Sequence, residues 1–134
     1  MKATRLLILA ALCACVHAQA QLVVNNTQTP QQLVQDVLLG NGVQAFNVTY
    51  NGVANPPANV IGSGSFTATN SNLGLAAGLI LSSGQVTAAA GASTGFSGNA
   101  NGTGSDPDLV SISGGTINDR AVLEFDFIPV GDTV

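Results

Sequence analysis

Reactive side chains are missing from almost the whole length of this chain. Its two cysteines, its single histidine and its only lysine all lie before residue 21, as Cys13, Cys15, His17 and Lys2, and the sequence has no tryptophan. Residues 21–134 therefore lack the groups needed for a nucleophilic triad, a zinc site, a Schiff base or a disulfide. Apart from a single arginine, any chemistry in this part must use oxygen and amide groups.

Charge is also scarce: 7% of the residues are charged, against 46% that are hydrophobic. Residues 21–134 contain one arginine, Arg120, and seven carboxylates, a formal charge of −6. This balance argues against nucleic acid or an anionic membrane surface as partner. The apolar content predicts a single folded domain, and a surface of neutral polar groups is typical of an extracellular protein.

The first twenty residues have the pattern of a secretory signal. Lys2 and Arg5 form the positive start, an apolar run covers residues 6–16, and the small residues Ala18 and Ala20 flank the expected cleavage site before Gln21. The apolar run is much shorter than the ~20 residues of a membrane-spanning helix, so no transmembrane helix is expected. We therefore predict a signal peptide at residues 1–20 and a secreted domain at residues 21–134.

A second way of processing the N-terminus stays open. The segment LCAC at residues 12–15 partly resembles a lipobox, in which Cys15 would carry the lipid. Processing at Cys15 would make the protein an outer-surface lipoprotein.

A short N-terminal helix is predicted from its capping residues. Thr29 is a helix-capping residue, Pro30 suits the first helical position, and Gln32 completes a capping box. The helix is expected to end in a left-handed turn at Gly40. Four apolar residues share one face of this predicted helix: Leu33, Val34, Val37 and Leu38.

The rest of the chain predicts β-structure. Extended segments are expected at 46–50, 60–68, 78–83 and 121–128, the third of them buried, with a tight turn at Asn51-Gly52 and a long exposed loop at 91–105. Alternation places Phe46, Val48 and Tyr50 on one face of the first strand, and Leu123, Phe125 and Phe127 on one face of the last, opposite Glu124 and Asp126.

We predict an all-β, β-sandwich-like domain with one short N-terminal helix. A turn into a further strand is expected at residues 131–134. A sheet without that strand would have a bare edge, so we expect the domain to be truncated before its C-terminal strands, as the front part of a longer protein.

Three motifs resemble the N-terminal part of the choice-of-anchor L domain family. They are GLILS at 78–82 followed by Gly84, DPDL at 106–109, and ND at 118–119 followed by the strand 121–129. The resemblance covers nearly all of residues 22–134. It implies a domain of a large secreted bacterial surface protein, attached to the cell through C-terminal modules outside this sequence, and it implies no catalytic activity.

The carboxylates between residues 104 and 127 are the candidate site. We predict that Asp106, Asp108 and Asp119 bind calcium, because this cation prefers hard oxygen ligands. Three asparagines could complete the shell: Asn99, Asn101 and Asn118. The alternative is a solvated acidic loop in which Asp and Asn serve as turn and cap residues.

Arg120 is expected to form a surface ion pair, and its possible partners are Asp119, Glu124 and Asp126.

An enzyme is the competing function, because a carboxylate pair is enough for glycoside hydrolysis. Its candidates are Asp106, Asp108, Asp119, Glu124 and Asp126. We expect instead an adhesive or structural domain that contacts an extracellular carbohydrate or protein surface, with no catalysis.

Overall fold

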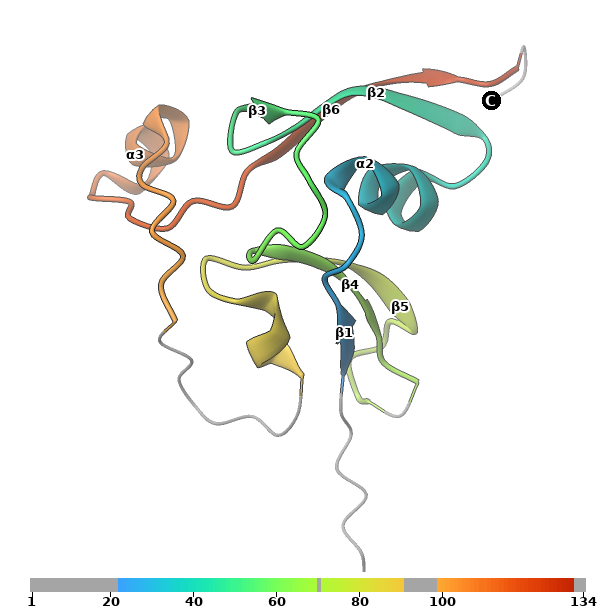
Figure 1. The fold of residues 1–134 in the computed structure, drawn as a ribbon, viewed down its shortest axis with the longest axis horizontal. Helices are drawn as coiled ribbons and strands as arrows, with labels where there is room; N and C mark the ends of the chain where they lie inside the picture. Colours follow the sequence, from blue (N-terminus) through green and yellow to red (C-terminus); the bar gives the residue numbers. More distant parts are fainter. Residues whose placement is uncertain (1–21, 70, 91–98, 132–134) are drawn as a thin grey trace, which may run out of the picture.

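The fold consists of two antiparallel sheets of three strands each, ordered β1-β4-β5 and β3-β2-β6 (Figure 1). The structure is a computed structural model that describes residues 22–69, 71–90 and 99–131. The strands are β1 (Val23–Asn25), β2 (Val43–Tyr50), β3 (Val53–Ala54), β4 (Ser63–Thr67), β5 (Ala77–Leu81) and β6 (Leu123–Pro129). Four helical segments join them: α2 (Pro30–Gln32), η1 (Leu33–Leu39), η2 (Val86–Ala89) and α3 (Pro107–Ser113). The predicted all-β, sandwich-like class is confirmed.

The N-terminal helix begins as its capping residues predict. The main-chain N–H of Gln32 donates to Thr29 Oγ1 at 3.2 Å, and the main-chain N–H of Thr29 donates to Gln32 Oε1 at 2.9 Å. Pro30 occupies the first helical position, where its missing N–H costs no hydrogen bond. The capping box is therefore complete.

The same helix continues as a π-helix, which changes the side chains that it buries. Gly40 N–H donates to Gln35 O at 3.0 Å, a bond that spans five residues, and Gly40 has a φ of 70°. Residues five apart then share a face, so Val34 and Leu39 both contact the core. Leu38, which was predicted to face inwards, is 52% exposed, and that prediction is wrong.

The core lies where this helix contacts the β3-β2-β6 sheet. Val34, Ala45 and Val48 are buried together, and Leu123 and Phe125 of β6 pack against them. Figure 1 shows α2 between β2 and β6 above and β4 and β5 below. The short helix thus fills space that the two small sheets cannot close alone.

A β-bulge in β2 alters the alternation expected for that strand. Between Phe46 and Thr49 the register advances by three residues on β2 and by two on β6, and Asn47 has a positive φ of 50°. Val48 and Tyr50 are buried as predicted, but Phe46 is 40% exposed. The predicted common face is wrong for Phe46, because the extra residue moves it to the opposite face.

The turn after β2 is the one predicted. Asn51 and Gly52 both have positive φ, at 52° and 79°, and they connect β2 to the antiparallel β3. Asparagine and glycine are the residues that accept this conformation most readily in a two-residue hairpin.

Two of the predicted strands are less buried than expected. In β6, Leu123 and Phe125 are half-buried and the two carboxylates are exposed, as predicted, but Phe127 is 61% exposed. Strand β5, predicted to be buried, is an outer strand that is half-buried at its centre and exposed at Ala77 and Leu81.

No helix within residues 22–69, 71–90 and 99–131 is long and apolar enough to span a bilayer. The predicted signal peptide at residues 1–20, the possible lipid site at Cys15 and most of the predicted turn at 131–134 lie outside the described residues.

Candidate functional site

Each of residues 101–106, which we call the anchored loop, takes part in a hydrogen bond. The first contact is Asn101, whose Nδ2 donates to Ser82 O at 3.3 Å and to Gly84 O at 2.8 Å. The next is Gly102, whose N–H donates to Asp119 Oδ1 at 2.6 Å. Asn101 therefore joins the loop to the turn after β5, and Asp119 uses its charge to cap a main-chain donor.

The second half of the anchored loop is held by Arg120. Thr103 Oγ1 donates to Arg120 O at 2.7 Å, and Arg120 N–H donates to Gly104 O at 3.2 Å. The guanidinium Nη1 then donates to Ser105 O at 2.9 Å. A long exposed loop was predicted at 91–105, but its described part is fixed by main-chain contacts, and residues 91–98 lie outside the described residues.

Arg120 also connects the anchored loop to the hairpin after β2. Its Nη2 donates to Asn51 O at 3.1 Å, and Asn51 Nδ2 donates back to Arg120 O at 3.2 Å. Asn51 Oδ1 accepts the N–H of Val122 at 2.9 Å, in the position where a main-chain carbonyl would otherwise continue the ladder. Arg120 and Asn51 thus hold three segments together: the hairpin, the anchored loop and the start of β6.

The ion pair predicted for Arg120 is not what the structure shows. Within the described residues, the hydrogen bonds of its guanidinium go to the carbonyl oxygens of Ser105 and Asn51 rather than to a carboxylate. The physical reason is geometric, because the planar guanidinium presents several donors in a fixed fork that here matches two carbonyls on different segments.

A hollow of about 520 Å³, which we call the main hollow, opens beside the anchored loop. Its apolar lining comes from Leu81, Leu109, Ile117 and Ala121, and its uncharged polar lining from Ser82, Ser83, Thr116 and Asn118. Asp119 and Arg120 are its charged residues, one of each sign. Figure 1 shows the anchored loop in orange, in the segment that leads into α3. The main hollow therefore has apolar, hydroxyl and amide groups within one small concave surface.

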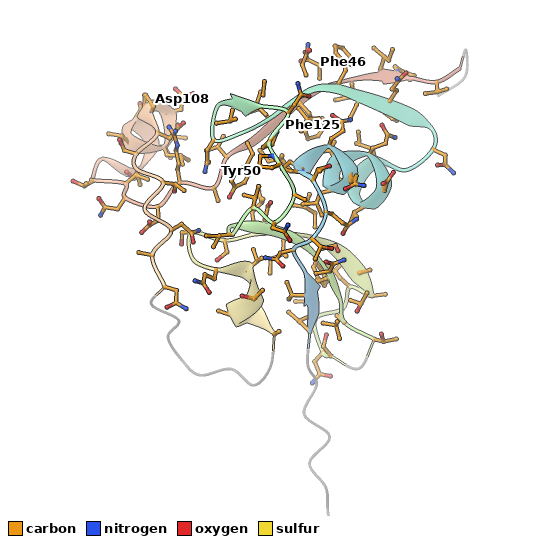
Figure 2. All side chains as sticks on the ribbon, in the orientation of Figure 1. Phe46, Tyr50, Asp108 and Phe125 are labelled. Atoms are coloured by element: carbon orange, nitrogen blue, oxygen red, sulfur yellow. The ribbon has the colours of Figure 1, made fainter. Side chains whose placement is uncertain are left out.

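Several polar side-chain atoms are buried without a hydrogen-bond partner. Among the described residues, Tyr50 Oη, Ser63 Oγ, Asn101 Oδ1 and Arg120 Nε have no hydrogen-bond partner in the protein. Tyr50 Oη and Asn101 Nδ2 both approach Gly62, at the point where a Cβ atom would stand. Figure 2 shows Tyr50 below the β2–β6 sheet, near the centre of the molecule. Tyr50 of β2 thus approaches the segment just before β4 through its polar end, apart from the apolar core.

The comparison with known families agrees with the resemblance seen in the motifs. A family model for the choice-of-anchor L domain matches residues 22–134. The chain belongs to the choice-of-anchor L domain family. No curated protein and no solved structure matches it significantly.

In this choice-of-anchor L domain, the family match includes both sheets, the anchored loop and the main hollow. Membership of the family indicates a domain of bacterial surface proteins.

The carboxylates predicted to bind calcium have separate roles in this choice-of-anchor L domain. Asp106 caps α3, since its Oδ1 accepts the N–H groups of Asp108 at 3.0 Å and Leu109 at 3.2 Å. Asp108 lies in the first turn of that helix, and Asp119 caps the anchored loop. In the described part of the chain, no three His, Cys, Asp or Glu side chains come together as a metal-binding group. Calcium binding by these three residues stays a prediction.

Calcium binding has a direct test in the melting temperature. A site that exists only in the folded state raises the melting temperature as calcium increases, up to about 10 mM for a weak extracellular site. Asp119→Asn should then remove the rise, and magnesium should not replace calcium. An unchanged melting temperature over this range would exclude the site.

The helix α3 was not predicted, although the sequence carries its signals. Asp106 and Pro107 repeat the cap and first-position proline seen at Thr29 and Pro30. Gly114, with a φ of 66° and a ψ of 11°, ends the helix in the left-handed conformation. The capping rule used at Thr29 and Pro30 also finds this helix when it is applied to Asp106 and Pro107.

The two carboxylates of β6 have neutral partners across the sheet. Glu124 Oε2 accepts from Thr49 Oγ1 at 3.2 Å, and Asp126 Oδ2 accepts from Asn47 Nδ2 at 2.8 Å. Both carboxylates are exposed. Solvent and neutral donors therefore reduce the repulsion between them.

Burial raises the pKa of the Tyr50 hydroxyl, because desolvation disfavours the phenolate. The neutral form thus contributes stability that is complete below the unfolded pKa of about 10, and this stability is lost as the pH rises through the higher folded pKa. We expect Tyr50→Phe to abolish this alkaline loss and to change the unfolding free energy at neutral pH by less than about 1 kcal/mol, since the hydroxyl has no protein partner.

Urea unfolding at neutral and alkaline pH measures both effects. Tyr50 is the only tyrosine and tryptophan is absent, so phenolate absorbance reports this residue alone. A normal titration near pH 10 in the folded protein would contradict the buried position of the hydroxyl.

Proposed function

We propose that this domain is exported and serves as an adhesive or structural domain of a bacterial surface protein, and that the main hollow binds neutral carbohydrate on an extracellular surface. The observation that carries the proposal is the lining of the hollow. Four hydroxyl or amide side chains lie there beside Leu81, Leu109 and Ile117. Sugars present hydroxyl groups and apolar C–H faces together, and such a mixed lining is complementary to both.

The charge of the protein supports a neutral ligand. Residues 21–134 carry a formal charge of −6, which opposes the approach of acidic glycans. Asp119 and Arg120 contribute one charge of each sign to the hollow, and both are already engaged with the main chain. Affinity at one such hollow is expected to be weak, so adhesion would depend on many copies acting together.

The hollows support binding over glycoside hydrolysis. A glycosidase needs two carboxylates roughly 5–9.5 Å apart across the scissile bond. Among the described residues, Asp119 is the single carboxylate that lines the main hollow, and Asp36 is the single one that lines a second hollow of about 320 Å³ beside β4 and β5. Neither hollow thus offers the acid and the base that this reaction requires.

A glycan array compares the chain with two asparagine variants. Asn118 is an exposed residue of the main hollow, and Asn72 is an exposed asparagine that does not line it. We expect Asn118→Ala to weaken binding to neutral glycans by about tenfold, the effect of one or two lost hydrogen bonds. Asn72→Ala is the matched control and should bind like the unmodified chain.

The array also separates the alternatives. Equal binding by both variants would place the ligand outside the main hollow. If the chain binds no glycan but binds immobilised extracellular proteins, the partner is a protein surface and not a carbohydrate. Release of sugar from bound glycans would support the competing function, a glycoside hydrolase.

Export is tested separately, from the N-terminus of the protein recovered from its cells. A mature chain that begins at Gln21 supports signal-peptide cleavage, and a lipid-modified Cys15 at the N-terminus supports the lipoprotein alternative. A protein that retains Met1 in the cytosol would contradict the proposed export.

A further inference from the structure

Three asparagines of this chain are followed directly by glycine: Asn41, Asn51 and Asn101. In such a pair the main-chain nitrogen of the glycine can attack the side-chain amide of the asparagine, because no Cβ atom of the glycine shields it. All three glycines are exposed, and a Cβ added to any of them meets nothing within 4 Å. The approach is thus open in each pair, and the hydrogen bonds of the asparagine decide where the attack can occur.

The amide of Asn51 is held at both ends. Its Nδ2 donates to Arg120 O at 3.2 Å, and its Oδ1 accepts the N–H of Val122 at 2.9 Å. Rotation of this amide towards the nitrogen of Gly52 would break both hydrogen bonds and leave the N–H of Val122 without its partner. The hairpin turn after β2 is therefore protected by its own contacts.

The amide of Asn101 is held as well. Its Nδ2 donates to Ser82 O at 3.3 Å and to Gly84 O at 2.8 Å, so the nitrogen that would have to leave is bound twice. The attacking group would be the nitrogen of Gly102, whose N–H donates to Asp119 Oδ1 at 2.6 Å. Both reacting groups of this pair are therefore fixed by other residues.

Asn41 lacks these restraints. It lies in the turn between η1 and β2, both Asn41 and Gly42 are exposed, and within the described residues the amide of Asn41 has no hydrogen-bond partner in the protein. The chain is fixed on both sides of the turn instead, because Gln35 Nε2 donates to Gly40 O at 2.9 Å and to Val43 O at 2.8 Å. The amide of Asn41 can therefore rotate towards Gly42 without breaking a side-chain hydrogen bond.

We propose that Asn41 is a modification site, at which the folded protein deamidates spontaneously to aspartate and isoaspartate. The nitrogen of Gly42 loses its proton to solvent and forms a bond to Cγ of Asn41, while the Cγ–Nδ2 bond breaks and ammonia leaves. Water then opens the resulting succinimide ring. Attack of water at the Cγ carbonyl gives aspartate, and attack at the main-chain carbonyl gives isoaspartate, in which the chain continues through Cγ. The sequence of steps consumes one water molecule and releases one ammonia.

Isoaspartate at residue 41 would alter the contacts around the turn. It adds one carbon atom to the main chain between Gly40 and Gly42, inside the segment that Gln35 holds from both sides. Gly42 O also accepts the N–H of Val130 at 3.1 Å. The longer main chain changes the spacing of these groups, so we expect the isoaspartate form, once separated by chromatography, to unfold at a lower urea concentration than the aspartate form. Asn41 does not line the main hollow, and this inference does not rest on carbohydrate binding.

Mass spectrometry of the aged 134-residue chain tests the proposal. The chain is kept folded at mildly alkaline pH and digested with chymotrypsin. Because Phe46 and Phe66 lie between the three Asn-Gly pairs, each pair falls in a separate peptide. We expect Asn41 to react at least about tenfold faster than Asn51 or Asn101, the protection that one or two hydrogen bonds provide. Equal rates at the three positions, or a faster reaction at Asn51 or Asn101, would overturn the proposal.

Two controls separate the effect of the fold from that of the local sequence. The chain unfolded in urea lacks the contacts of Asn51 and Asn101, so the three rates should become similar. Gly42→Ala, which places a Cβ in open space, should slow the reaction at Asn41 and leave the other two rates unchanged. Persistence of the folded-state ranking in urea would contradict protection by hydrogen bonds, and an unchanged rate in Gly42→Ala would contradict attack by the Gly42 nitrogen.

Discussion

Gly62→Ala is expected to destabilise the fold by about 2–4 kcal/mol, through overpacking and the loss of neighbouring hydrogen bonds. The added Cβ would contact Tyr50 Oη and would stand 2.8 Å from Ser82 O and 3.0 Å from Asn101 Nδ2. Ser82 has little freedom to move, because its N–H donates to Gly62 O at 2.9 Å. Relief would have to come from Asn101, which would then release its two carbonyl partners.

Gly42→Ala is the matched control for this substitution. A Cβ at Gly42 meets nothing within 4 Å. Urea unfolding of both variants separates crowding from the general effect of replacing glycine with alanine. Equal stability of the two would contradict the close approach of Tyr50 and Asn101 to Gly62.

Arg120→Met is expected to cost about 2–3 kcal/mol and to loosen the anchored loop. The variant keeps an unbranched side chain but loses the hydrogen bonds to Ser105 O and Asn51 O. Partial exposure of Arg120 and removal of its unpartnered Nε both reduce the cost. Urea unfolding measures the stability, and faster hydrogen exchange at the amides of Gly102 and residue 120, which both donate hydrogen bonds in this region, reports the loosening.

Arg120→Lys distinguishes the fork geometry from the charge. An ammonium group keeps the positive charge, but it cannot match the planar fork that reaches two carbonyls on different segments. We expect lysine to recover less than half of the stability lost in Arg120→Met. Full recovery would show that the charge alone stabilises this region, as the predicted ion pair required.

Local signals in the sequence predicted much of the fold. The capping box at Thr29 and the turn at Asn51-Gly52 depend on residues a few positions apart, and both are confirmed. The bulge at Asn47 depends on how β2 pairs with β6. The side chain of Asn47 donates a hydrogen bond to Asp126 of β6, which lies 79 positions away in the sequence. A strict alternation could not anticipate it, which is why the prediction for Phe46 was wrong.

The candidate site was less predictable, because its side chains bind to the main chain. Residue types suggested that Asp119 and Arg120 would act through charge, with calcium or with one another. In the structure they bind main-chain groups of the anchored loop, at Gly102 and Ser105, seventeen and fifteen positions away. The positions of main-chain groups depend on the complete fold, so residue type alone could not show these roles. The same limit applied to the main hollow, which forms between segments distant in sequence.

Carbohydrate binding in the main hollow can be observed residue by residue in an NMR titration of the ¹⁵N-labelled chain with a mixture of neutral oligosaccharides. We expect the amide signals of Ser83, Asn118, Asp119 and Arg120 to shift in a saturable manner, and those of β1 and β3 to stay in place. Shifts confined to other surfaces, or an unchanged spectrum at saturating oligosaccharide, would contradict it.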